Sequence, residues 1–90
     1  MFCSLFSKMN FQDKKQSLEK LILMIEKEVS CSNKVSSSNR IQDTIKTCIR
    51  ICPKHKIIFQ DIHRLFIQER YYLVNLRIIE MKRLIHNNQI

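Results

Sequence analysis

The chain has 90 residues, with no Gly or Trp and a single Pro, and its 16 Lys and Arg against 8 Asp and Glu give a formal net charge of +8. A chain of this length forms one small domain that buries only about 60% of its unfolded surface, so we expect marginal stability without a partner, a metal or disulfides. The scarcity of turn-forming residues disfavours a many-stranded β fold, and the lack of Gly excludes a Gly-rich phosphate loop.

Apolar runs in the sequence are short. The longest, Leu21 to Ile25, is far below the roughly 20 residues of a transmembrane helix. The first residues also lack the charged start, long apolar middle and small-residue cleavage site of a secretory signal. We therefore expect an intracellular protein, in the cytoplasm, nucleus or mitochondrion. In a reducing compartment its 4 Cys are expected to be free thiols in preference to disulfides.

Residues 1–12 form an amphipathic, acid-free segment in which Phe2, Leu5, Phe6 and Met9 fall at i, i+3, i+4 and i+7. Targeting segments and membrane-surface anchors start in this way, although transit peptides usually carry more than one basic residue. The alternative is a turn that frays or docks on the domain.

Residues 13–29 give the clearest helical pattern. Asp13 can cap the helix, and one stripe runs along it through Leu18, Leu21, Ile22, Ile25 and Val29. Residues 30–39 are rich in Ser and Asn and indicate a flexible loop between helices.

A second helix is predicted from Ser38 or Asn39 to Cys52, because Pro53 cannot continue the helical hydrogen bonds. Its apolar stripe consists of Ile41, Ile45, Cys48, Ile49 and Cys52. Both cysteines therefore belong to a core-facing stripe, where a thiol acts as a small apolar group.

The same cysteines raise the question of a metal site, since Cys48, Cys52 and His55 are the residue types that zinc prefers. Structural zinc usually takes its cysteines from a short turn, whereas these lie on a predicted helix. We expect no metal and no cofactor.

From His55 to His86 no residue breaks a helix, so the sequence predicts a third helix of about 32 residues and about 48 Å. One face carries a set spaced four and three apart, as in a coiled-coil seam: Ile67, Tyr71, Val74, Ile78, Met81 and Ile85. The opposite face is also apolar, with Ile62, Leu65, Phe66, Tyr72, Leu73, Leu76, Ile79 and Leu84.

A helix that is apolar on two opposite faces has to be covered on both. The seam packs either on the first helix of the same chain or on a partner, in a homodimer or a larger complex. We expect partner binding through Ile67, Tyr71, Val74, Ile78, Met81 and Ile85, with Arg70 and Arg77 as flanking charges that orient docking.

Catalysis has few candidates. Cys48 or Cys52 could act with His55, and Asp61 with His63, but three helices in a chain of this size seldom form the pocket that a nucleophile and its base require. We therefore predict no enzymatic activity.

Nucleic-acid binding is the alternative function, because the net charge is strongly positive. The candidates diverge on a helical wheel, whereas phosphate binding needs them on one face. They are Lys54, Lys56, Arg64, Arg70, Arg77, Lys82 and Arg83, with Tyr71 and Tyr72 for stacking.

The stretch LFIQERYYLVNLRII, residues 65–79, resembles the last helix of LYR-motif mitochondrial assembly factors. The resemblance implies a small, basic, three-helix protein that binds partner subunits. The Leu-Tyr-Arg triplet itself is absent, and its nearest N-terminal counterpart, FCSLFSK, has neither the Tyr nor the Arg. An assembly-factor-like role is the third possibility.

Together these patterns predict an all-α protein: residues 1–12 as a separate segment, and residues 13–90 as one domain, a helical hairpin or small three-helix bundle with a long C-terminal helix. The function expected is that of a non-enzymatic adaptor or complex subunit that docks an apolar helix face into a protein partner.

Overall fold

The computed structural model describes residues 10–31 and 34–90. In these residues it has four α-helices, α2 (Phe11–Val29), α3 (Lys34–Ile51), α4 (Lys56–Ile67) and α5 (Tyr71–His86), and a 3-10 helix, η1 (Pro53–His55). No strand occurs in this part of the chain, so the all-α prediction is confirmed. None of these helices is both long and apolar enough to cross a membrane.

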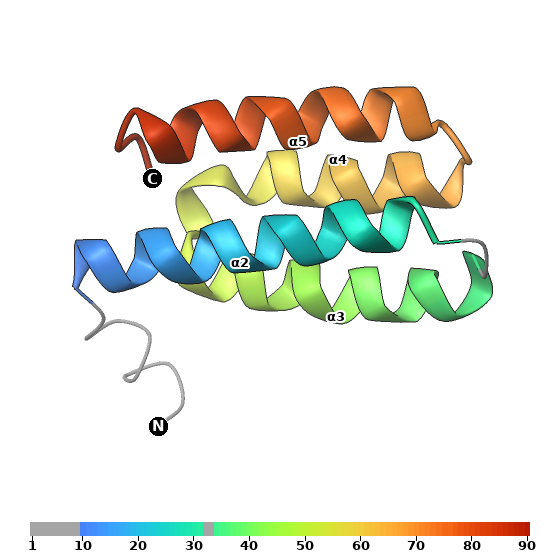
Figure 1. The fold of residues 1–90 in the computed structure, drawn as a ribbon, viewed down its shortest axis with the longest axis horizontal. Helices are drawn as coiled ribbons and strands as arrows, with labels where there is room; N and C mark the ends of the chain where they lie inside the picture. The colour runs from blue at the N-terminus through green and yellow to red at the C-terminus, as the bar shows by residue number, and fades with distance from the viewer. Residues whose placement is uncertain (1–9, 32–33) are drawn as a thin grey trace.

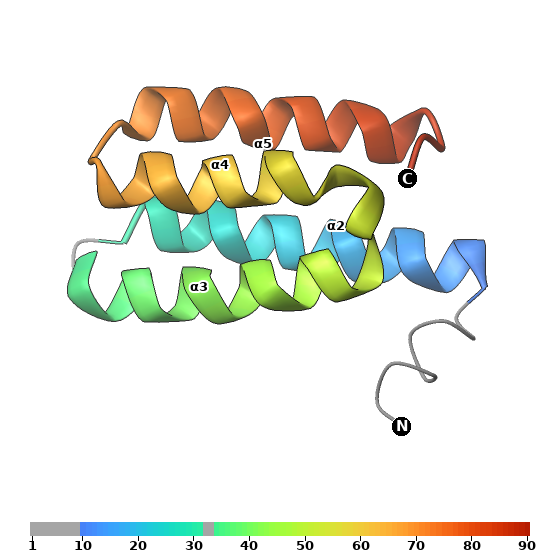
Figure 2. The ribbon, with the colours of Figure 1, turned by 180° about the vertical axis from the view of Figure 1, so that it is seen from behind.

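The four helices run antiparallel to their neighbours and form a bundle (Figures 1 and 2). Helix α2 packs beside α3 and α5, and α4 packs beside the same two helices. Every helix therefore has two neighbours and one edge turned toward the common core, as expected for an up-down-up-down bundle with short loops.

The predicted long C-terminal helix is wrong, because the chain reverses at Gln68–Arg70 and residues 56–86 form the two helices α4 and α5. The reversal has the hydrogen bonds of a Schellman motif: the Glu69 N–H donates to Phe66 O (3.0 Å) and the Arg70 N–H to Leu65 O (2.9 Å). Glu69 takes the left-handed conformation (φ 60) that glycine usually supplies at this position.

The reversal explains the two apolar faces of residues 55–86. Once α5 folds back beside α4, Ile62 and Phe66 from one set and Val74 and Ile78 from the other point into the same core. A continuous helix would have left one of these sets exposed to water, at roughly 1.5 kcal/mol or more per large side chain.

The core receives side chains from all four helices. The stripes predicted for α2 and α3 contribute Leu18, Ile22, Ile25, Val29, Ile41, Ile45, Cys48 and Cys52. Helices α4 and α5 contribute Phe59, Ile62, Leu65, Phe66, Val74, Ile78, Met81 and Ile85. The residues of α5 that have coiled-coil spacing thus pack inside the chain's own bundle.

Two helix starts differ from the prediction. Helix α2 is capped by Asn10, whose Oδ1 accepts a hydrogen bond from the Asp13 N–H at 2.8 Å, so Asp13 belongs to the first turn. The predicted loop 30–39 is also too long, because α3 already begins at Lys34.

Tertiary contacts account for the early start of α3. Ser37 is fully buried, and the Lys34 ammonium donates to Val29 O and lies 4.5 Å from the centre of the Tyr71 ring. These contacts outweigh the low helix propensity of a Ser-rich stretch, which is a weak local preference. The predicted targeting or anchoring segment lies outside the described residues up to Met9.

Candidate interaction surface

Cys48 and Cys52 lie in the core as free thiols, 0% and 4% exposed. Burial, reinforced by the neighbouring Cys52, raises the pKa of Cys48 to about 12. His55 Nε2 is 2.6 Å from Gln89 O, so this imidazole ties η1 to the C-terminal residues. No group of three His, Cys, Asp or Glu side chains in residues 10–31 and 34–90 comes together as a metal site.

The residues of the predicted partner-binding seam differ in how far the structure buries them. Val74, Ile78, Met81 and Ile85 are at most 2% exposed, Tyr71 is half-buried, and Ile67 alone is largely exposed. A partner could reach the four buried side chains only if the bundle opened. The sequence left open whether this seam packs on the first helix of the same chain or on a partner, and in the structure its buried residues face α2 and α4 inside the bundle.

The two flanking arginines of that seam also differ in their surroundings. Arg70 is exposed at the start of α5. The Arg77 guanidinium pairs within its own helix with Glu80 (2.9 Å) and lies 3.9 Å from Asp61 of α4. Arg77 therefore helps to join α4 to α5.

The exposed apolar side chains of α5 are Tyr72 (76%), Leu76 (43%) and Ile79 (51%). Their spacing of four and three places them within about 60° of one another on the helix. They lie on the side of α5 turned away from the core residues Val74 and Ile78.

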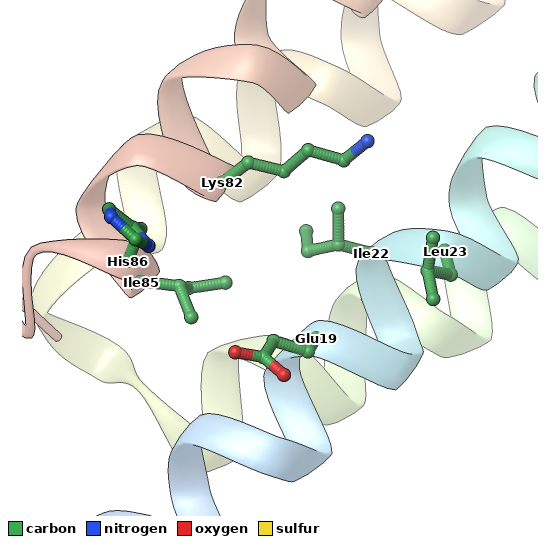
Figure 3. Close-up of a pocket in the computed structure, with 6 residues that line it drawn as sticks. All are labelled: Glu19, Ile22, Leu23, Lys82, Ile85 and His86. Atoms are coloured by element: carbon green, nitrogen blue, oxygen red, sulfur yellow. The ribbon is translucent and has the colours of Figure 1, made fainter.

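A groove of about 280 Å³ runs between α2 and α5 (Figure 3). Its apolar floor is formed by Ile22 and Ile85, and its walls by Glu19, Leu23, Lys82 and His86. Beside it, Lys82 Nζ lies 2.7 Å from Glu26 Oε1 and joins the two helices.

Leu23 lies three residues before Glu26 on α2, and Ile79 lies three residues before Lys82 on α5. Because the Glu26–Lys82 ion pair joins α2 and α5 at this level, Leu23 and Ile79 lie on the same side of the molecule. We call Leu23, Tyr72, Leu76 and Ile79 the outer face.

The lining of the groove suits apolar contact better than catalysis. Glu19 and His86 are its acid and imidazole, and its lining has no Ser, Thr, Cys or Tyr that could act as a nucleophile.

The cations considered for nucleic-acid binding do not converge. Arg64, Arg77 and Lys82 are held in ion pairs with Asp61, Glu80 and Glu26. Lys54 lies in η1 and Lys56 is the first residue of α4, whereas Arg70 lies beyond the other end of α4. Tyr71 and Tyr72 are also at that far end, so stacking groups and lysines are separated.

No family model, curated protein or solved structure matches this chain. The stretch 65–79, which resembles the last helix of LYR-motif assembly factors, is divided here between α4 and α5 by the Schellman motif. An assembly-factor-like role therefore stays a prediction.

Three of the four residues of the outer face were present in the sequence as part of the second apolar set. Tyr72, Leu76 and Ile79 belong to that set together with Ile62 and Phe66, which the structure buries. A signal for the reversal at Gln68–Arg70 would have separated the two groups, but neither Gly nor Pro marks it.

Proposed function

We propose that this protein is a non-enzymatic helical adaptor or complex subunit that binds a protein partner through the outer face. The observation that supports this is the apolar surface of α5: Tyr72, Leu76 and Ile79 are exposed over two turns, although the core beneath them is complete. Contiguous exposed apolar side chains of this kind mark interaction sites on small proteins.

The size of the outer face sets the strength of binding. Covering the exposed parts of its four side chains contributes on the order of 4 kcal/mol, which only matches the lower end of the roughly 4 to 15 kcal/mol that association costs in lost translational and rotational freedom. The outer face therefore acts as the apolar centre of a larger contact. Arg83, exposed one turn beyond Ile79, favours a partner whose own apolar surface is bordered by acids.

Site-specific photo-crosslinking tests the proposal in the cells that make the protein. A photoreactive amino acid in place of Tyr72 should give a discrete protein adduct, and Leu76→Asp with Ile79→Asp should remove that adduct without unfolding the chain. The same photoreactive group in place of the exposed Gln42 on α3 is the matched control.

An adduct of twice the mass of the chain would identify the partner as a second copy. Identical adducts from positions 72 and 42, or an adduct that persists in the double variant, would contradict the proposal.

A further inference from the structure

A second cavity, of about 230 Å³, lies at the end of the bundle where α2 begins and α3 ends. Its floor is apolar and consists of Leu18, Ile51 and Cys52, which are at most 4% exposed. Ile90, which follows α5, forms part of its wall. The cavity is thus enclosed by segments from both ends and the middle of the described chain.

Two hydrogen bonds hold the residues after α5 against this end of the bundle. Lys15 Nζ donates to Asn88 Oδ1 at 3.1 Å, and His55 Nε2 lies 2.6 Å from Gln89 O. These residues turn back from the end of α5 toward the connection between α3 and α4 (Figure 1). They bring Ile90 to the cavity, where it is half-buried. The wall is therefore built by the fold.

The charged side chains of the lining are two lysines. Lys54 is exposed and Lys14 is half-buried, so their ammonium groups reach toward solvent at the mouth of the cavity while their stems contribute to the lining. Neither lysine takes part in the ion pairs formed in the part of the chain that the structure describes, and none of the described lining residues is an acid. Two unpaired cations thus stand over an apolar floor.

Helix electrostatics do not account for these lysines. Lys14 lies in the first turn of α2 and Lys54 just before α4, where the positive end of a helix stabilises negative charge. Both cations are therefore unfavourably placed in the folded chain. An anion bound at the mouth of the cavity relieves this repulsion.

We infer that this cavity binds a small amphipathic anion: an unbranched apolar chain that ends in a carboxylate, the chemistry of a short fatty acid. The apolar chain contacts the floor of Leu18 and Ile51, and the carboxylate oxygens accept hydrogen bonds from the ammonium groups of Lys14 and Lys54. The cavity shares no residue with the outer face, so the two proposals succeed or fail separately.

The volume of the cavity limits the size of the ligand. An apolar cavity of about 150 Å³ holds benzene, which has six non-hydrogen atoms. In proportion, a cavity of 230 Å³ holds about nine such atoms, one fewer than octanoate, whose carboxylate lies at the mouth. A mononucleotide is too large to enter, so the size favours a short acid over a nucleotide.

NMR titration of the full chain with unbranched carboxylates tests the inference. Octanoate should shift the methyl signals of Leu18, Ile51 and Ile90 with a dissociation constant on the order of 0.1 to 1 mM. Affinity should rise about fourfold for each methylene added from hexanoate to octanoate, because each is buried on the apolar floor. It should level off at decanoate, whose chain exceeds the cavity.

Variants separate the head group from the chain. Lys14→Gln with Lys54→Gln should weaken octanoate binding roughly tenfold, as expected for two exposed ion pairs, and leave binding of neutral 1-octanol unchanged. Ile90→Ala should weaken octanoate and 1-octanol alike, by roughly fivefold. The matched control is Lys20→Gln with Lys27→Gln, which makes the same charge change at exposed positions of α2 outside the cavity and should bind octanoate as wild type does.

Circular dichroism and melting temperature verify that every variant is folded, and the outer-face variant Leu76→Asp with Ile79→Asp should bind octanoate normally. Three results would overturn the inference: an affinity that does not rise with chain length, an equal loss in the control, or binding of 1-octanol as tight as that of octanoate. Methyl shifts confined to Ile22 and Ile85 would contradict it as well, because they would place the ligand in the groove between α2 and α5.

Discussion

Two residues of this Gly-free chain take positive φ in the described structure, Glu69 (φ 60) and Asn88 (φ 58). Each follows the last turn of a helix, and Asn88 repeats the motif with its N–H on Ile85 O and the Gln89 N–H on Leu84 O. Asn tolerates this conformation, whereas an exposed Glu gains nothing there and bears the steric cost of its Cβ.

Glu69→Gly should therefore raise the free energy of unfolding by about 1 kcal/mol, measured by urea denaturation. Asn88→Gly should change it by less, because Asn already suits the position. Glu80→Gly, inside α5, should lower it by about 1 kcal/mol. If Glu69→Gly destabilised the chain as Glu80→Gly does, the reversal between α4 and α5 would not exist as described.

The buried thiol of Cys48 makes stability depend on alkaline pH. Its pKa is about 12 in the folded chain against an ordinary value of 9.0. Below pH 9.0 the thiol is protonated in both states and the contribution is fully present. Above it the unfolded chain loses the proton first, so stability falls until the pH passes about 12.

Between pH 9 and pH 10, wild type should lose about 1 kcal/mol more than Cys48→Ala, measured by urea denaturation at each pH under reducing conditions. The comparison with Cys48→Ala subtracts Tyr and Lys titrations common to both chains. An equal loss of stability in wild type and Cys48→Ala would mean that the Cys48 thiol is accessible to solvent. Rapid reaction of Cys48 with a thiol reagent in the folded protein would also mean that it is accessible.

At the scale of the element, α5 has two apolar surfaces with different roles. Val74 and Ile78 are at most 1% exposed, whereas Leu76 and Ile79 are about half exposed. All four share one helix and one residue class, so their roles follow from the contacts of α5 with α2 and α4.

Val74→Asp with Ile78→Asp should unfold the chain, because each buried, unpaired carboxylate costs several kcal/mol against a total stability of about 5 to 10 kcal/mol. Leu76→Asp with Ile79→Asp makes two aliphatic-to-Asp changes, three residues apart, on the exposed side of the same helix and should change stability by less than about 1 kcal/mol. Thermal unfolding followed by circular dichroism distinguishes them, and equal destabilisation of both variants would show that α5 is not oriented as described.

At the scale of the whole molecule, positive charge is distributed unevenly along the bundle. The ion pairs formed by Arg40, Arg64, Arg77 and Lys82 balance charge along the helices. The cations near the starts of α2 and α4 and the ends of α3 and α5 take part in none of the ion pairs of the described residues: Lys14, Lys15, Arg50, Lys54, Lys56 and Arg83. Like charges gathered at one end repel one another, and salt weakens that repulsion over a Debye length of about 10 Å at 0.1 M.

The free energy of unfolding should therefore rise as salt is added. Lys54→Gln with Lys56→Gln should stabilise the chain by about 0.5 to 1 kcal/mol at low salt and by less at high salt. Urea denaturation at two ionic strengths measures both effects, and Lys20→Gln with Lys27→Gln is the control. A stability that falls with salt would mean that the five ion pairs outweigh the repulsion.

The helical period of the sequence determined a large part of this protein by itself. It placed Leu18, Ile22 and Ile25 on one face of α2, and it placed both cysteines with Ile41 and Ile45 in the core, where the structure has them. These features depend on spacing within one helix, which the sequence shows directly.

Only the tertiary structure decided where the chain reverses and which apolar face is covered. Glu69 is not a residue type that announces a reversal, and a Ser-rich stretch such as residues 36–38 does not announce a buried helical turn. The reversal is closed by its own hydrogen bonds and by the packing of α5 on α4, and the start of α3 is held by contacts of Lys34 with Val29 and Tyr71. A helical pattern tells which side chains share a face, but neighbouring helices determine whether that face becomes core or surface, and so they separate the buried seam from the outer face.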